Sequence, residues 1–296
     1  MKINRLRLDP TSDQLHILSL LGDRVSALWN AANYTCRQQF LAGERVPSYT
    51  ALCSAFLTHP TYRALPSDIA QEVLKKLAEA WTSFRELWRR WQQGTLDAKP
   101  GLPRYRKRGD GTRPTDFIAI KCDRSYRVNG RTVEVTLPKD VSAQRLVMGY
   151  RGTQRYCGPG RRAEIWYDAG RDRWYLTYAV EAPSPPPRPW TRRAGIDLGV
   201  RILASVSIEG IAQAVHFRGR ELLKDFRYWQ RQVARHQQEL SHRPKALRTS
   251  KRLRRLYATQ RARLRHAWEA MAQQIAGRLH RHRVGLVAIG WPRGIG

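Results

Sequence analysis

The sequence predicts an α+β chain made of several lobes, and three observations lead to this fold class. Apolar residues recur at helical spacing between residues 11 and 94, whereas residues 116–182 alternate in polarity as strands do. After a proline-rich stretch at residues 183–189, strand-like and helical runs follow one another again. The length of 296 residues is ample for a buried core, in one large domain or in two to three small ones.

The charge balance indicates a polyanionic partner. The chain has 54 Lys and Arg against 24 Asp and Glu, which gives a formal net charge of +30 at pH 7. This excess argues against most small-molecule metabolic enzymes and favours nucleic acid, with an anionic membrane as the weaker alternative. The longest apolar run, Val284–Ile289, is too short to span a bilayer. Four widely spaced cysteines and the lack of a signal-peptide pattern predict a reduced, cytoplasmic protein.

The first part of the chain predicts one strand followed by helices. Residues 1–10 alternate apolar and basic side chains until Asp9-Pro10 ends the run. Helical spacing then dominates, and Pro66-Ser67-Asp68 predicts the start of a long helix, with Asp68 and Gln71 at capping-box spacing. We interpret the apolar stripe of this helix as core packing. Its members are Leu74, Leu77, Trp81, Phe84, Trp88 and Trp91.

A basic segment follows at Lys99–Arg108, where five cations surround one tyrosine. Two interpretations remain open for it. It is either a solvated linker or a segment that contacts the backbone of nucleic acid while its tyrosine stacks on a base. The candidate nucleic-acid-binding residues of this segment are Arg104, Tyr105, Arg106, Lys107 and Arg108.

The middle of the chain predicts a small antiparallel barrel or sandwich. Ala163–Tyr167 and Arg173–Val180 flank a turn signal at residues 168–172 and therefore predict a hairpin. Residues 183–189 contain five prolines, so we expect a stiff linker and a domain boundary there.

The last third predicts strands at Ala194–Val200, Ile202–Ile208 and Ile211–Phe217, two long antiparallel helices with facing apolar seams, and a buried strand at Val284–Ile289. The segment Ser241–Ser250 separates the two helices. Their outer faces are dense in arginine with few balancing acids, which favours contact with phosphates. The candidate residues are Arg248, Lys251, Arg252 and Arg255.

The motif with chemical meaning is Gly195-Ile196-Asp197-Leu198-Gly199. On a strand, Ile196 and Leu198 face one side together with Val200, and Asp197 faces the other between two glycines. An RNase H-like sheet presents its first metal-binding aspartate in this way, and two-metal phosphodiester cleavage needs several such carboxylates around two Mg²⁺ ions. Actin-like ATPases share the pattern, and a buried or capping aspartate also explains it.

The ordered set of motifs resembles the TnpB proteins, also called OrfB-type transposases, which are transposon-encoded relatives of the compact type V CRISPR effectors. The resemblance covers nearly the whole chain. The motifs that carry it are Gln71–Trp91, the Pro103-Arg104-Tyr105-Arg106 segment, the Trp174-Tyr175 hairpin, the RuvC-like motif Gly195–Val200, and the long helix at Ser250–Arg283.

The resemblance implies an RNA-guided, metal-dependent DNA endonuclease involved in transposition. It implies a β-barrel wedge domain at residues 1–10 plus 95–185, an inserted helical recognition lobe at 11–94, and a partial RNase H-like (RuvC) α/β domain with a basic helical hairpin at 191–296. The implied partners are a guide RNA and target DNA, with no membrane. The implied location is the cytoplasm, on the nucleoid when DNA is bound; the oligomeric state stays open.

The sequence also departs from the family pattern. Asp197 is the candidate catalytic residue and Mg²⁺ ligand, but Gly290 stands where the family has its second RuvC glutamate. The third aspartate and the zinc ligands would lie beyond Gly296, so the chain as given looks truncated, and we expect it to hold Mg²⁺ weakly or not at all and no zinc. We interpret other acids as helix-surface charges, namely Asp225, Glu239 and Glu269.

Four functions therefore stay open: an RNA-guided nuclease, a nuclease-dead RNA-guided DNA binder or repressor, a degenerate transposon fragment, and a basic RNA-binding protein that uses no guide. The missing carboxylates predict that the chain as given does not cleave DNA.

Overall fold

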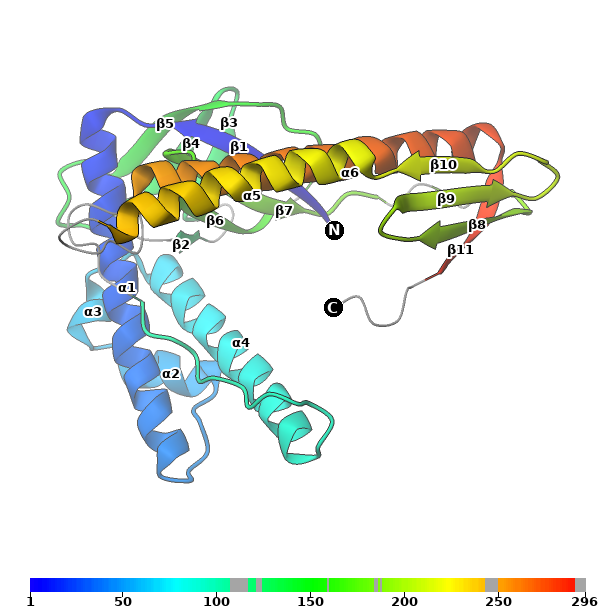
Figure 1. The fold of residues 1–296 in the computed structure, drawn as a ribbon. Helices are drawn as coiled ribbons and strands as arrows, with labels where there is room; N and C mark the ends of the chain where they lie inside the picture. Colours follow the sequence, from blue (N-terminus) through cyan, green and yellow to red (C-terminus); the bar gives the residue numbers. More distant parts are fainter. Residues whose placement is uncertain are drawn as a thin grey trace. The chain divides into compact units, whose positions relative to one another are not determined.

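The computed structural model describes residues 1–106, 117–120, 124–158, 160–183, 186, 188–242 and 250–290. The chain forms two compact units, Met1–Pro183 and Ser184–Gly296, which we call unit 1 and unit 2 (Figure 1). Both mix helices with strands, and each has its own hydrophobic core. The division falls at the start of the proline-rich stretch.

Unit 1 contains four helices that pack against one another. They are α1 (Ser12–Leu41), α2 (Tyr49–Phe56), α3 (Pro60–Arg63) and α4 (Ser67–Gln92). A capping box starts α1: the Thr11 side chain accepts from the Gln14 backbone, and the Gln14 side chain accepts from the Thr11 backbone. The capping box predicted for α4 is wrong, because that helix starts at Ser67 after Pro66 with no side-chain cap.

The aromatic stripe of α4 lies in the core of unit 1, which confirms its interpretation as packing. Trp81 and Phe84 are buried, and Trp88 is half-buried. Phe40 of α1 contacts all three rings at centroid distances of 5.2–5.7 Å, in tilted and edge-to-face arrangements. The stripe therefore fixes α4 against α1.

The strands of unit 1 form one seven-stranded antiparallel sheet in the order β2-β6-β7-β1-β5-β4-β3. The strands are β1 (Lys2–Asp9), β2 (Phe117–Ile120), β3 (Tyr126–Asn129), β4 (Thr132–Thr136), β5 (Arg145–Arg151), β6 (Gly160–Asp168) and β7 (Arg173–Val180). The sheet curls, so that Tyr126 on the edge strand β3 meets Tyr178 on β7 with ring centroids 6.1 Å apart. Within the described residues no ladder joins β2 to β3, so the pairing differs from a closed barrel.

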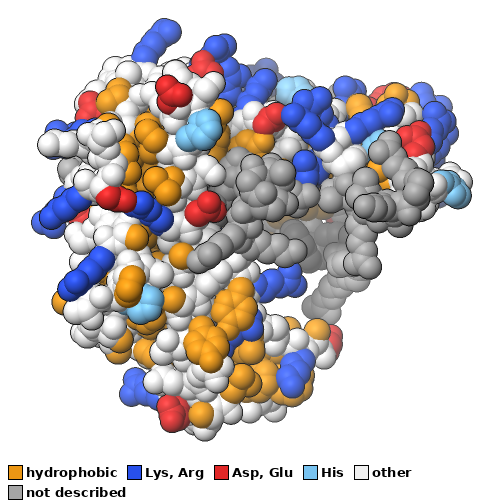
Figure 2. Space-filling model, turned by 90° about the vertical axis from the view of Figure 1, so that its left-hand side faces the viewer, with side chains coloured by type: hydrophobic (Ala, Val, Ile, Leu, Met, Phe, Trp, Pro, Cys, Tyr) orange, Lys and Arg blue, Asp and Glu red, His pale blue; other side chains and the backbone are white. Residues whose placement is uncertain are grey.

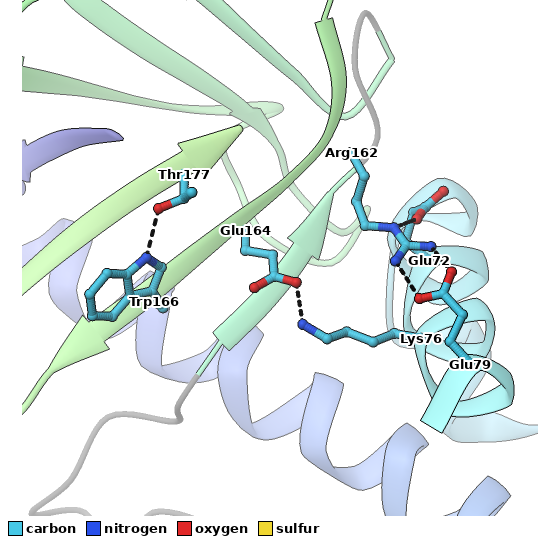
Figure 3. A network of polar contacts seen from close by, with 7 residues as sticks. All are labelled: Glu72, Lys76, Glu79, Arg162, Glu164, Trp166 and Thr177. Atoms are coloured by element: carbon cyan, nitrogen blue, oxygen red, sulfur yellow. Dashed lines mark hydrogen bonds and ion pairs between the residues drawn. The ribbon is translucent and has the colours of Figure 1, made fainter. Parts of the chain in front are cut away.

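Ion pairs attach α4 to this sheet (Figure 3). Arg162 on β6 donates to both Glu72 and Glu79, and Lys76 pairs with Glu164. The hydrogen bond from Arg162 lowers the pKa of Glu79, and the same bond raises the pKa of Arg162. The Glu72 side chain is only 10% exposed, so the ion pair with Arg162 offsets the cost of its burial.

Unit 2 has a four-stranded sheet in the order β10-β9-β8-β11 and two long helices. Its elements are β8 (Arg192–Leu198), β9 (Ile202–Ile208), β10 (Val215–Arg218), α5 (Arg220–Ser241), α6 (Lys251–Arg281) and β11 (Val284–Gly290). The predicted strand ends were wrong at two points. Val200 lies beyond β8 and is 59% exposed, and Ile211 precedes β10 because the chain first turns at Gly210.

The strand β11 pairs in parallel with β8, but the prediction that it is buried was wrong. Leu286 is 60% exposed and Ile289 is 59% exposed, because within the described residues neither face of β11 is covered after Val284. Among the described residues, no helix is long and apolar enough to cross a membrane.

The helices α5 and α6 form an antiparallel hairpin, as predicted (Figure 1). Arg263 of α6 pairs with Asp225 of α5 at 2.8 Å, and further along Arg252 lies 3.9 Å from Glu239. Between the helices, the buried His236 ring contacts Ser250, the N-cap of α6, at 2.9 Å. These cross-contacts fix the register of the hairpin.

Candidate nucleic-acid interface and metal position

Asp197 lies on the outer face of the unit 2 sheet. The residues directly across from it are Ser205 on β9 and Gly290 on β11, and His216 on β10 continues the same row. Asp197 and His216 are exposed, and the Ser205 hydroxyl lies 3.0 Å from His216 Nδ1. The prediction that the carboxylate projects from the sheet is confirmed.

Gly195 and Gly199, which flank Asp197, differ in how much room they leave for a side chain. A Cβ at Gly199 would lie 2.9 Å from the Ile202 carbonyl oxygen, so the turn from β8 to β9 excludes a side chain there. A Cβ at Gly195 would meet only the Ser207 hydroxyl at 3.5 Å, an ordinary contact. The tight turn thus accounts for Gly199 without any ligand.

Gly290 is the position where a second carboxylate would be most useful. A Cβ there would lie 3.3 Å from Asp197 Oδ1, so any acidic side chain at 290 would stand beside Asp197. Within the described part of the chain, no three His, Cys, Asp or Glu side chains gather in one place. Asp225 and Glu239 are engaged in the hairpin. This donor set does not fit two Mg²⁺ ions, which need several convergent oxygen ligands.

The cations of α6 are the strongest electrostatic feature of unit 2. The helix carries nine Lys and Arg and a single acid, Glu269. Lys251, Arg252 and Arg255 are exposed in its first turns, whereas Arg248 lies outside the described residues. Figure 2 shows Lys and Arg spread over one face of the molecule, with fewer Asp and Glu. Such exposed cations can contact phosphates.

These cations and Asp197 do not converge on one site. The C-terminal half of α6 packs through Ile275 on the apolar face of the sheet, together with Ile196, whereas Asp197 points from the opposite face. Arg255 lies twenty residues before Ile275, which is about 30 Å along a helix. Arg255 therefore lies far along α6 from the part of the helix that packs on the sheet.

The basic segment of unit 1 is held firmly along α1. We call residues 99–106 the strap; Lys107 and Arg108 lie outside the described residues. Asn30 forms two hydrogen bonds with the Arg106 backbone, at 2.8 and 2.7 Å, and Asn33 donates to the Pro103 carbonyl at 2.9 Å. Figure 1 shows the chain after α4 returning along α1. The strap is therefore docked on α1 through its backbone, while the choice between a solvated segment and a nucleic-acid contact stays open.

Two arginine–aromatic stacks hold the strap on α1, and they leave different strap residues exposed. Arg37 lies 4.3 Å from the centre of the Tyr105 ring and donates to the Pro103 carbonyl, while Tyr105 stays 43% exposed. Arg106 lies over the Trp29 ring at 4.3 Å and is half-buried. Arg104 is exposed. Arg104 and Tyr105 are thus exposed, whereas Arg106 stacks on Trp29; nucleic-acid binding by all three stays a prediction.

Sequence reasoning missed the residues that position the strap. Asn33 is fully buried and also accepts a hydrogen bond from Trp81 of α4 at 2.9 Å, so it joins both helices to the strap. The available signal was a polar residue on the apolar side of α1, at helical spacing from Trp29 and Arg37.

Comparisons with known proteins show what the chain is similar to. Residues 175–296 match the OrfB_IS605 family model, which is described as a probable transposase. The TnpB-like protein ORF457 of Acidianus two-tailed virus is 26% identical over 323 residues, covering 98% of this chain and 68% of the viral protein.

Solved structures give the fold. The protein of a Cas12f1–sgRNA–target DNA complex aligns with a TM-score of 0.59 at 13% identity, over 94% of this chain and 65% of its own. A Cas12f ternary complex aligns with a TM-score of 0.41 at 12% identity, over 93% and 62%. The chain thus spans less than two thirds of these proteins. The transposase-family match over residues 175–296 and the TnpB-like viral relative support a TnpB-type (OrfB) family member, and the solved structure shows a Cas12f1-like fold.

Proposed function

We propose that the chain binds a guide RNA and, through it, recognises target DNA in a transposon context. The observation that carries this proposal is the cation-rich helix α6, which carries nine Lys and Arg and a single acid and exposes several of these cations. Cations spread along a helix can contact several phosphates of one nucleic acid, and a mononucleotide does not supply several phosphates in a row. A long polyanion is therefore the ligand that fits this helix.

The protein and the guide RNA would make different kinds of contact with the target DNA. Arginines on a helix surface bind phosphates and sense the shape of a duplex, and they carry no sequence information by themselves. In RNA-guided systems base pairing with the guide supplies that information. The cations of α6 and the accessible strap residues Arg104 and Tyr105 are the positions we assign to backbone and base contacts.

We infer that residues 1–296 bind DNA without cutting it. The family activity, RNA-guided metal-dependent DNA cleavage, requires carboxylates beside Asp197, and Gly290 supplies none. Cleavage is the second candidate, because Asp197 is exposed in the motif that resembles the first RuvC motif of the family.

Purification with bound RNA tests the proposal. RNA that co-purifies with the chain is sequenced, and gel shifts then compare DNA matched to that RNA with scrambled DNA of equal length. We expect matched DNA to bind more tightly and the affinity to fall steeply with salt. RNA binding without preference for matched DNA would instead indicate a guide-independent RNA-binding protein. If the folded chain binds neither, the fragment interpretation holds.

A cleavage assay separates the two candidates. The RNA-loaded chain is incubated with matched DNA and Mg²⁺, and we expect the DNA to stay intact. Cutting that is lost in Asp197→Ala would establish the nuclease instead.

A further inference from the structure

Unit 1 contains a cavity of about 560 Å³ that none of the sites above uses. It lies where β1 passes into α1, beside the turn between β6 and β7. The side chains that matter for its chemistry are Arg7, Asp9, Tyr167, Asp172, Arg173 and Trp174. Its volume lies in the range of small-molecule and nucleotide pockets.

An aromatic pair forms one wall of this cavity. The rings of Tyr167 and Trp174 lie 5.4 Å apart between centroids. The Tyr167 hydroxyl donates to Asp172, which fixes the ring from the turn. Tyr167 is half-buried and lines the cavity, where a planar base could meet its ring.

The indole nitrogen of Trp174 is buried and lacks an acceptor among the described residues. The residue is 3% exposed, and within the described part of the chain its Nε1–H has no acceptor. An indole nitrogen can only donate, and a buried donor without a partner is costly. Because this nitrogen has almost no accessible surface, a ligand in the cavity would contact the Trp174 ring and not its Nε1–H.

The charges around the cavity favour an anion. Asp9 is engaged by Arg151 at 2.9 Å, and Asp172 accepts from Tyr167. Arg7 and Arg173 have no ion-pair partner among the described residues, and Arg173 is exposed. Two available guanidinium groups beside a fixed aromatic ring match a phosphate beside a planar base.

We propose that this cavity holds one unpaired nucleotide of the bound RNA, with its base against Tyr167 and its phosphate on Arg7 and Arg173. The assignment rests on the proposed RNA-binding function. Unpaired bases of RNA loops and ends are commonly recognised by stacking on aromatic side chains, which favours RNA over duplex DNA here.

Titration of the full chain tests the pocket directly. The probe is the single-stranded ribonucleotide pentamer rA5, and the readout is the indole ¹H–¹⁵N resonance of Trp174, assigned with Trp174→Phe. We expect a saturable shift, and an affinity at least tenfold above that of free AMP because neighbouring phosphates also bind. An unmoved resonance at saturation would overturn the proposal. Equal affinity for AMP, or for dA5, would overturn the assignment to an RNA strand.

Variants localise the contact. Arg7→Gln/Arg173→Gln should weaken rA5 binding about tenfold and reduce the slope of log affinity against log salt by about 1.4, the value for two phosphates of a single strand. The matched control is Arg127→Gln/Arg131→Gln, which removes equal charge from exposed positions elsewhere in unit 1. An equal loss in the control would mean that no specific pocket exists.

A second variant isolates the stacking. Tyr167→Leu should weaken rA5 binding about tenfold while leaving the salt slope unchanged, because the ring carries no charge. If the wild-type chain co-purifies with RNA while all pocket variants bind rA5 normally, the pocket fails and the proposed function stands. If no RNA co-purifies but rA5 still shifts Trp174, the proposed function fails instead.

Discussion

The two units use their arginines differently. In unit 1, Arg37 and Arg106 stack on aromatic rings, and Arg162 bridges two glutamates. In unit 2, Arg255 and Arg265 on α6 are exposed, with no acidic partner in the described part of the chain. The difference teaches that the large net charge divides into cations that hold the fold and cations available to a ligand.

The largest effect should come from the exposed cations at the start of α6. Lys251→Gln/Arg252→Gln/Arg255→Gln should lower nucleic-acid affinity about 100-fold at physiological salt, because three phosphate contacts contribute a salt slope of about 2.7. Gel shifts across a salt series measure this.

The matched control carries the same charge change on α4 of unit 1, as Lys75→Gln/Arg85→Gln/Arg90→Gln, all at exposed positions. It should change affinity far less. Equal losses in the two triples would break the comparison between the units.

Next in size is the loss of a structural arginine. Arg162→Ala leaves the nearly buried Glu72 without its partner, and we expect it to lower the free energy of unfolding of unit 1 by about 2 kcal/mol. Denaturant titration of the full chain measures this. Because Arg162 lowers the pKa of Glu79, the benefit is complete above the ordinary glutamate pKa and declines as pH falls through the lowered pKa.

The difference between wild type and Arg162→Ala should accordingly shrink on acidification. A difference that stays constant with pH would show that packing, and not the ion pairs, accounts for it. The Arg145–Glu134 pair is more exposed, so Arg145→Ala should cost much less and serves as the control.

A third test addresses the outer face of unit 2. Gly290→Glu places a carboxylate next to Asp197, and we expect Mn²⁺ affinity to rise by about tenfold, since a second oxygen ligand joins the first. Titration calorimetry measures the change. The gain should vanish when Asp197→Ala is added, and a gain that persists would place the ion elsewhere.

The smallest effect concerns the strap. Arg37→Lys removes the planar stack on Tyr105 and one of two hydrogen bonds to the Pro103 carbonyl, so strap anchoring should weaken by about 1 kcal/mol. Hydrogen exchange of the Arg106 amide, which donates to Asn30, reports this opening. Unchanged protection would mean that the hydrogen bonds of Asn30 and Asn33 hold the strap without the Arg37 stack.

The sequence predicted most helices and strands of the chain because their periodicity is local. The α4 stripe and the β6–β7 hairpin both follow from spacings within a few residues. The exposure of β11 did not follow, because an apolar run looks the same at an edge as in the middle of a sheet. Curling of the unit 1 sheet also depends on contacts far apart in sequence, such as Tyr126 with Tyr178.

The candidate site was predictable in part for the same reason. Exposure of Asp197 follows from alternation along β8. That it stands opposite Gly290 follows from the parallel pairing of strands more than ninety residues apart, which no local pattern reveals. The docking of the strap on Asn30 and Asn33 is hidden in the same way, since those contacts join residues 70 and 76 positions apart.

The central place of β1 has a consequence for how the protein is made. The first strand to leave the ribosome pairs with β5 on one side and with β7 on the other. It must therefore wait, with both edges open, until residue 180 has emerged. The helices α1 to α4 can pack meanwhile, since their contacts are nearer in sequence. The sheet of unit 1 is thus completed only when β1 pairs with both β5 and β7. A translation product that stalls before β7 would leave one edge of β1 unpaired and prone to aggregation.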